Sequence, residues 1–148
     1  MDVIGMKSTI SGVKIQPLSL KNTAAGRRLE IFSRSQKISA SDVSLQICYP
    51  GGAYAWFANH ADFQWLACVN GDIQLAIFDH RRSSESFGAI DERFVGAHNL
   101  LRIGIPKDVC FGWKTLSNTE SWMLMFSKNN RSAEKMFPAD TELIPYLW

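Results

Sequence analysis

Side chains that could carry out acid–base or covalent chemistry are few in this sequence. The histidines, whose imidazoles change charge most readily near neutral pH, are His60, His80 and His98. The cysteines are odd in number, widely spaced and each inside an apolar segment, at Cys48, Cys68 and Cys110. This spacing fits neither a zinc site nor a disulfide framework, so we expect buried free thiols, with a catalytic thiol as the alternative.

Arginines provide a second kind of chemistry, because a guanidinium group binds phosphate. Arg27 and Arg28 precede a β-rich segment, and Arg81 and Arg82 follow Asp79. Either pair could contact a phosphate. The alternative is that they are surface charges or ion-pair partners of nearby carboxylates.

The length and composition are those of an ordinary globular domain. The 148 residues are 46% apolar and 20% charged, which is enough to bury a hydrophobic core, and we expect a single domain over residues 1–148. The formal net charge of +2 gives no reason to expect nucleic acid or an anionic membrane as a partner. No window approaches the ~18 apolar residues of a membrane-spanning helix, so we expect a cytoplasmic protein.

Short segments rich in β-branched and aromatic residues, separated by turn residues, predict an all-β protein. No stretch of a dozen residues has a clean helical period. The predicted strands are residues 28–33, 43–48, 53–57, 63–69, 72–78, 93–95, 100–105, 109–115 and 121–126. One helical turn is predicted at 132–136, and the apolar tail 143–148 should pack onto the barrel or onto a neighbouring subunit.

The Asn70-Gly71 pair predicts a tight hairpin, because a type I′ turn needs positive φ at both central residues. Segment 63–69 should therefore pair with segment 72–78. Segment 63–69 is apolar on both faces, as is typical of a central strand. In the second segment one face is formed by Ile73, Leu75 and Ile77.

Several short motifs, taken in order, resemble those of a known family. They are Ala25-Gly26-Arg27-Arg28-Leu29, then Tyr49-Pro50-Gly51 with Ala55-Trp56, then Phe78-Asp79-His80-Arg81 with Gly88, and finally Ile105-Pro106 through Gly112-Trp113. Over roughly residues 12–148 the chain resembles the small cupins related to dTDP-4-dehydrorhamnose 3,5-epimerase. The first motif departs from the family's Asp-x-Arg-Gly segment, because it lacks the Asp and its Gly precedes the Arg.

The resemblance implies a single-domain cupin, which is a jelly-roll β-barrel of two antiparallel sheets, usually a homodimer, with its ligand in the barrel mouth. Enzymes of this family need no metal and no nicotinamide cofactor. They epimerise carbons beside a 4-keto group, with a His–Asp pair as the base and a Tyr as the acid. The ligand so implied is a nucleotide sugar or another carbohydrate.

Residue by residue, however, the catalytic groups of that family are replaced. Its two important histidines fall on Phe57 and Phe111, and its Tyr falls on Leu124 by ungapped counting. A Phe cannot accept a proton and a Leu cannot donate one, so the family's mechanism cannot run on these residues. The Lys that meets the nucleotide phosphate falls on Gln64, and an Arg near the catalytic His falls on Tyr54.

Metal binding is disfavoured by the same substitutions. Many other cupins hold a divalent metal through a His-x-His pair and a later His. Those positions are Phe57, Asn59 and Phe111 in this chain, so we expect no metal site. If Phe111 points into the barrel, Cys110 must point away from it, because neighbours in a strand alternate.

His60 and Asp62, just after Phe57, are the candidates for relocated acid–base groups, with a solvated loop histidine as the alternative. The candidate ligand-binding residues are Phe57, Phe111, Tyr54, Gln64, Trp113, Arg27 and Arg28. Each aromatic residue among them could equally be part of the core.

Three functions remain open for such a barrel. The first is a nucleotide-sugar epimerase or isomerase with relocated groups, and the second is a non-catalytic sugar-binding or interaction module in a polysaccharide pathway. The third is a structural module whose barrel is filled. An open pocket containing His60 favours the first, an open pocket without titratable groups the second, and a closed barrel the third.

Overall fold

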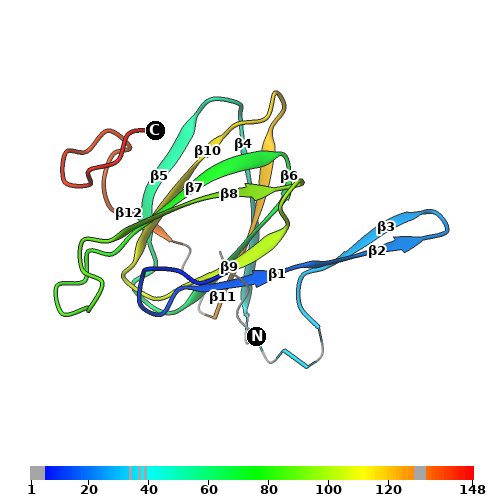
Figure 1. Cartoon of the computed structure of the whole chain (residues 1–148), viewed down its shortest axis with the longest axis horizontal. Helices are drawn as coiled ribbons and strands as arrows, with labels where there is room; N and C mark the ends of the chain where they lie inside the picture. Colours follow the sequence, from blue (N-terminus) through cyan, green and yellow to red (C-terminus); the bar gives the residue numbers. More distant parts are fainter. Residues whose placement is uncertain (1–5, 34, 37, 39, 129–132) are drawn as a thin grey trace.

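The computed structural model describes residues 6–33, 35–36, 38, 40–128 and 133–148 and has two five-stranded antiparallel sheets packed face to face (Figure 1). The described residues form strands, turns and bends but no helix, which confirms the all-β prediction. None of the described segments therefore has the helical length and apolarity that crossing a membrane would require.

The first sheet has the strand order β1-β9-β6-β11-β4. Its strands are β1 (Lys14–Pro17), β9 (Leu101–Ile105), β6 (Gln64–Asn70), β11 (Ser121–Ser127) and β4 (Asp42–Cys48). The second sheet has the order β12-β5-β10-β7-β8. Its strands are β12 (Glu134–Lys135), β5 (Ala53–Ala58), β10 (Cys110–Thr115), β7 (Asp72–Phe78) and β8 (Ile90–Gly96).

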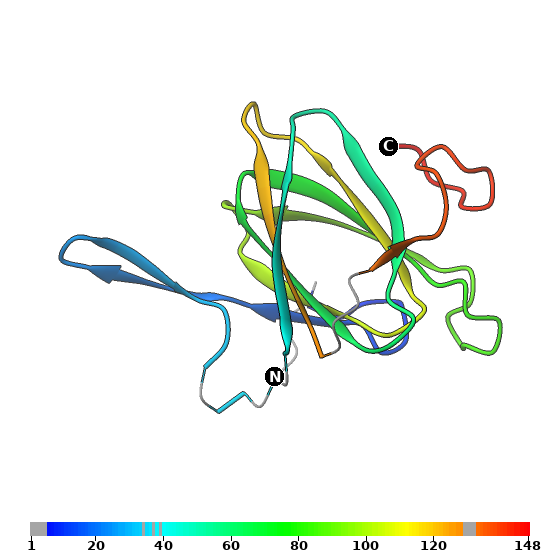
Figure 2. The same ribbon diagram turned by 180° about the vertical axis from the view of Figure 1, so that it is seen from behind.

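A third, two-stranded element projects away from the barrel (Figures 1 and 2). It is a hairpin of β2 (Ser19–Thr23) and β3 (Gly26–Glu30), which we call the arm. Every residue of β2 is exposed. The sequence did not predict β1 or β2, because β1 ends in a proline and β2 is polar on both faces, so neither has the apolar alternation that marks a strand.

The main core lies between the two sheets. One inward face of β7 is formed by Ile73, Leu75 and Ile77, as predicted, and all three are fully buried. They pack with inward residues of the first sheet such as Leu66, Ile103 and Met123. Burying a large aliphatic side chain contributes about 1.5–3 kcal/mol to folding, so this layer holds the two sheets together.

A second core lies on the outer face of the second sheet, where the chain end covers it. Trp56 and Ile144 are almost completely buried there, and the Trp148 ring is centred 5.1 Å from that of Trp56. The Tyr146 hydroxyl donates to Glu92 Oε2 at 2.7 Å. The apolar tail thus packs onto the barrel, which was one of its two predicted destinations.

The helical turn predicted at 132–136 is wrong for the part that the structure describes. Glu134 and Lys135 form β12, which pairs with the edge strand β5. Residue 132 lies outside the described residues. The free edge of β5 offers backbone partners that a single helical turn cannot match, so tertiary pairing overrides local preference.

The hairpin predicted around Asn70-Gly71 is also wrong. β6 and β7 follow one another with only Gly71 between them, yet they belong to different sheets. Asn70 pairs with Trp122 in the first sheet, and Asp72 pairs with Gly96 in the second. Gly71 has the expected positive φ of 73°, but it moves the chain from one sheet to the other. The dipeptide indicates where the backbone turns, whereas distant strands decide what it pairs with.

We expect Gly71→Ala to destabilise the fold much more than Gly88→Ala. Both glycines have positive φ, 73° and 84°, so both substitutions carry about 1–2 kcal/mol of left-handed strain. A Cβ on Gly71 would also lie 2.7 Å from Ser117 Oγ and 3.0 Å from Glu120 O, whereas a Cβ on Gly88 would meet nothing within 4 Å. Urea denaturation should show about 1–3 kcal/mol of extra loss for Gly71→Ala. Equal losses would contradict the packing argument.

Candidate functional site

A β-bulge in β5 shapes the interior of the barrel. Phe57 lies opposite Phe111, and Tyr54 lies opposite Trp113, so three steps along β5 match two steps along β10. In a regular strand, residues 54 and 57 would point to opposite faces. The one extra residue puts Tyr54 and Phe57 on the same face.

Gly112 makes room for this bulge. A Cβ at position 112 would lie 2.4 Å from Ala55 Cβ and 2.9 Å from Ala55 Cα, closer than any side chain permits. The bulged segment of β5 therefore rests directly on the backbone of β10. The bulge contains a cis peptide bond between Ala55 and Trp56.

Four aromatic rings lie together as a result, and we call them the aromatic cluster: Tyr54, Phe57, Phe111 and Trp113. The Tyr54 and Phe57 rings are stacked, with centroids 4.2 Å apart and planes at 16°. Tyr54 also lies 4.7 Å from Trp113, and Trp113 is parallel to Phe111 at 6.3 Å. Burial raises the pKa of the Tyr54 hydroxyl, and the nearby Cys48 thiol adds to the shift.

The cluster has a closed side and an accessible side. Phe111 and Trp113 have no exposed surface and belong to the main core, whereas Tyr54 and Phe57 are half-buried and pack against it. The exposed surface of the cluster is therefore that of Tyr54 and Phe57 alone. The interior around Phe111 and Trp113 is filled by side chains.

Gln64 lies near one end of the interior. It is almost completely buried on β6, at the same parity as the inward-facing Leu66 and Cys68, and its Oε1 has no hydrogen-bond partner among the described residues. An unpaired buried carbonyl oxygen is costly, and it is an acceptor available to a donor that enters the barrel.

Leu124, on which the family's Tyr falls by ungapped counting, does not face the interior. Its neighbours Met123 and Met125 are buried in the main core, and strand alternation turns Leu124 to the outer face of the first sheet. The inward positions beside it are therefore both methionines. No side chain at these three positions can donate a proton.

His60 lies in the loop after β5, where its ring meets a carboxylate that the sequence analysis did not single out. His60 Nδ1 is 2.7 Å from Asp108 Oδ1, and Nε2 is 3.0 Å from Met136 Sδ. Asp108 has a positive φ of 65°, and its N–H donates to Asn59 O at 2.8 Å, which ties its turn to the His60 loop. No spacing signal could reveal this pair, because the two residues are 48 positions apart.

Asp62 lies close to His60 in sequence but has different surroundings. Its Oδ1 accepts from the Phe63 N–H at 2.7 Å, and it lines a groove on the outer face of the first sheet. The carboxylate partner of the His60 ring is therefore Asp108 rather than Asp62.

The loop after β7 is built around the buried carboxylate of Asp79. Arg81 donates to it from Nε at 2.8 Å and from Nη2 at 2.9 Å, and the hydroxyls of Ser84 and Ser86 donate at 2.6 Å each. Arg81 is thus held in an ion pair with Asp79, which was the predicted alternative to phosphate binding. Asp108 and Arg81 both line a groove of about 510 Å³ at this end of the barrel.

Arg27 and Arg28 lie in the arm, exposed and away from the aromatic cluster of their own chain. The cysteines match the expectation of free, buried thiols. Burial raises the pKa of Cys68 and of Cys110 to about 12, so neither is a ready nucleophile. Phe111 belongs to the inner core and Cys110 to the outer one, as strand alternation predicted.

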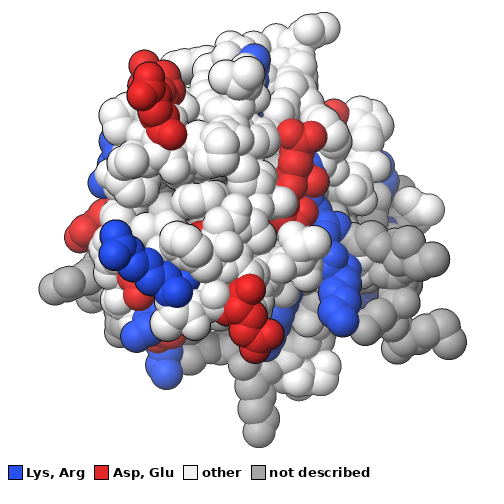
Figure 3. All heavy atoms as spheres, turned by 60° about the vertical axis from the view of Figure 1, so that its left-hand side comes forward, with Lys and Arg blue, Asp and Glu red and all other residues white. Residues whose placement is uncertain are grey.

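Charges on the surface are mixed in sign. On the face in Figure 3, Lys and Arg side chains alternate with Asp and Glu and do not gather into a patch of one sign. Within the described ranges, no three His, Cys, Asp or Glu side chains lie close enough together to hold a metal ion.

The Asp79 network generates a pH prediction. Burial raises the pKa of this carboxyl, but hydrogen bonds from Arg81, Ser84 and Ser86 outweigh burial and hold the pKa well below its usual range. Below pH ~4 the unfolded chain therefore takes up a proton that folded Asp79 resists, and stability falls with pH in that window. Urea denaturation at pH 5 and at pH 3 measures the free energy of unfolding. Between these two pH values it should fall by at least about 1 kcal/mol less for Asp79→Asn than for the wild type. Glu85→Gln, an exposed carboxylate in the same loop, should behave as the wild type; equal losses in all three proteins would refute the assignment.

Comparison with known proteins shows which of them are similar to this chain in sequence and in fold. No family model matches the chain. A curated relative, the probable low-salt glycan biosynthesis epimerase Agl13 of Haloferax volcanii, is 27% identical over 141 residues, which cover 93% of this chain and 88% of that protein.

Solved structures share the fold at lower identity. The dTDP sugar isomerase from Desulfovibrio desulfuricans G20 superposes with a TM-score of 0.86 at 20% identity, over 95% of this chain and 92% of that one. The dTDP-4-dehydrorhamnose 3,5-epimerase from Bacillus anthracis has a TM-score of 0.76 at 15% identity, over 97% and 88%. The chain thus has the fold of the dTDP-4-dehydrorhamnose 3,5-epimerase-related cupins, as the motif order predicted.

Proposed function

We propose that this chain, which shares the fold of the dTDP-4-dehydrorhamnose 3,5-epimerases, binds a nucleotide-linked deoxysugar against the Tyr54–Phe57 stack. The observation that carries the proposal is this half-buried pair of stacked rings on one face of β5. The family that the chain resembles has polar site residues at these two positions. Flat aromatic faces suit a nucleobase or the apolar face of a sugar. Gln64 Oε1 is an additional acceptor within the barrel.

The relatives support the same class of ligand. Agl13 is named as a glycan biosynthesis epimerase, and the structure from Desulfovibrio desulfuricans as a dTDP sugar isomerase. A 3′-monoepimerase from Streptomyces bikiniensis with this fold was solved in complex with dTDP. In this chain, positions 57 and 111 are both Phe, so the side chains there have no group that moves a proton.

A second candidate function is epimerisation or isomerisation with a relocated base. The observation that favours it is the contact between His60 and Asp108, because a carboxylate that accepts from Nδ1 orients the ring. In that case His60 is the base and Asp108 its positioning residue, whereas the Asp62 carboxylate accepts from the Phe63 N–H.

Proton NMR of a dTDP-4-keto-6-deoxyhexose in deuterated water tests the two functions together. If the chain is a binder, ligand signals broaden and show saturation transfer, while the C3 and C5 protons stay at full intensity. Tyr54→Ala should weaken binding by about tenfold, because it removes one of the stacked rings. Tyr49→Ala, which removes a Tyr that is 78% exposed, is the matched control and should bind normally.

The opposite outcomes are equally specific. Loss of the C3 or C5 signals at a rate proportional to protein, abolished by His60→Gln, would replace the binding proposal with the relocated-base function. Absence of both broadening and exchange would rule out this nucleotide sugar as the ligand.

We also propose that two copies of the chain associate through the outer face of the first sheet. On β4 and β11, three cross-strand pairs form a continuous apolar surface, which we call the outer patch: Val43 with Phe126, Leu45 with Leu124, and Ile47 with Trp122. The three β4 residues are 43–57% exposed, and a patch of this kind on an edge strand favours association. In such a dimer the arm could bring Arg27 and Arg28 to the partner's barrel.

Sedimentation velocity should therefore give twice the mass of one chain. We expect Leu45→Lys to shift the protein to monomer, because it buries a charge in an apolar interface. Phe94→Lys is the control, since Phe94 is 57% exposed on β8 of the other sheet. A monomeric wild type, or equal dissociation by both variants, would contradict this association.

A further inference from the structure

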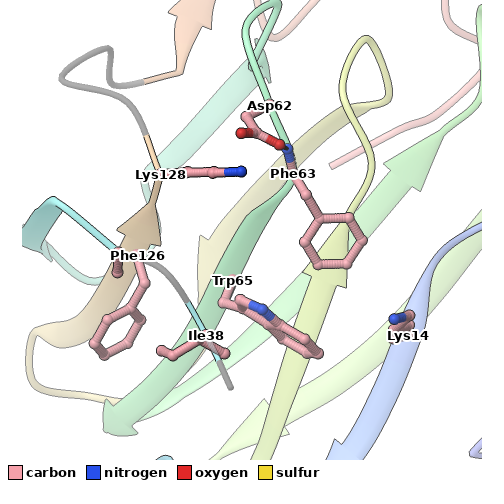
Figure 4. A pocket seen from close by; sticks show the side chains of 8 residues that line it. Lys14, Ile38, Asp62, Phe63, Trp65, Phe126 and Lys128 are labelled. Atoms are coloured by element: carbon pink, nitrogen blue, oxygen red, sulfur yellow. Dashed lines mark hydrogen bonds between the residues drawn. The ribbon is translucent and has the colours of Figure 1, made fainter. Parts of the chain in front are cut away.

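A groove on the outer face of the first sheet has the composition of a small ligand site distinct from the barrel interior (Figure 4). It encloses about 320 Å³, at the small end of the range for ligand pockets. Its aromatic floor comes from β6 and β11, and charged side chains stand around it. The lining residues used in the argument are Lys14, Asp62, Phe63, Trp65, Phe126 and Lys128.

The aromatic floor is built into the sheet. A Cβ on Gly104 would lie 2.4 Å from the Phe63 ring and 3.0 Å from the Trp65 ring, so only glycine allows these rings to pack this closely against β9. The Phe63 and Trp65 centroids are 5.2 Å apart. Phe32 lies edge-on to both Trp65 and Phe126, which fixes their orientation.

Positive charge predominates around this floor. In Figure 4 the Lys128 side chain extends toward Asp62 and Phe63, with the Trp65 and Phe126 rings below it. Lys14 Nζ lies 5.6 Å from the Phe63 ring centroid on another side. The described lining residues therefore include two ammonium groups and one carboxylate.

Arg102 adds a third cation beside Trp65, on the same face of β9 as Gly104. It is 6% exposed, and its guanidinium lies 5.3 Å from the Trp65 ring. Its hydrogen bonds go to neutral acceptors, namely the side-chain oxygens of Gln16 and Gln36 and the backbone carbonyl of Ile31. A buried guanidinium normally has an anionic partner, and the described residues show no ion pair to it.

We propose that this groove binds a single sugar ring that carries a negatively charged group, such as a phosphate or a carboxylate. The aromatic side chains of the floor suit the apolar face of a pyranose, and the volume suits one ring rather than a complete nucleotide sugar. The two lysines contact the anionic group, and Asp62 accepts hydrogen bonds from hydroxyls. The field of Arg102 favours an anion at the floor.

Titration with four probes tests the proposal. The readout is the Trp65 indole signal in ¹H–¹⁵N spectra, which is assigned by its absence from the spectrum of Trp65→Phe. Glucose 1-phosphate and glucuronate, which separate a phosphate from a carboxylate source, should both shift the signal. Glucose tests the ring without charge, and inorganic phosphate tests charge without the ring; each should bind at least tenfold more weakly.

Two double variants with equal loss of charge complete the test. Lys14→Gln with Lys128→Gln should weaken binding of glucose 1-phosphate at least tenfold. Lys114→Gln with Lys135→Gln, on the second sheet, should leave it unchanged. Equal effects of the two double variants, or equal binding of glucose or of inorganic phosphate, would overturn the proposal.

The groove borders the outer patch at Phe126, so the mass of each variant is measured as well. If the wild-type protein binds none of the probes, the anionic-sugar site is refuted. If, in addition, the Lys14 and Lys128 variant alone dissociates the dimer, the groove is a contact surface for a second copy. The proposed barrel function is independent of both results, because its Tyr54 variant leaves the groove intact.

Discussion

The contact between the bulge of β5 and Gly112 of β10 is the constraint on which most of this structure depends. One extra residue in β5 turns Tyr54 and Phe57 inward and Trp56 outward. The inward rings form the aromatic cluster, and Trp56 is the centre of the outer core that holds the C-terminal tail. A side chain at position 112 would push the two strands apart and disturb both cores. The aromatic cluster and the anchoring of the chain end thus share one cause.

The barrel keeps its apolar interior separate from two clusters of polar side chains. Around Phe111 and Trp113 the barrel interior is filled, and two polar clusters lie in loops at one end. There the contact of His60 with Asp108 and the buried network of Asp79 join segments that are distant in sequence. Because Asp79 neutralises Arg81 and orders the loop through two serines, this end of the barrel is rigid without a regular element.

The two outer faces of the sandwich have different roles. The outer face of the second sheet is covered by the chain's own tail, through Ile144, Tyr146 and Trp148. On the first sheet, the outer patch of β4 and β11 is uncovered, and it continues into the groove beside Phe126 and Trp65. The arm projects from the barrel (Figures 1 and 2). The surfaces that we propose for a second copy and for an anionic sugar therefore lie on the side of the molecule that its own chain leaves open.

The sequence by itself determined the all-β class, most strand positions and the cupin-like order of motifs, because alternation and turn residues act over a few neighbours. From the resemblance, it also predicted that Phe57 and Phe111 stand where the family has proton-transferring groups, and this stays a prediction. Only the tertiary structure decided that β6 and β7 part at Gly71, that Tyr54 joins Phe57 on one face, and that Leu124 faces outward. It likewise decided that Asp108, and not Asp62, is the partner of His60. Each of these outcomes depends on which distant strand or loop is adjacent, and contacts between residues tens of positions apart leave no local pattern in the sequence.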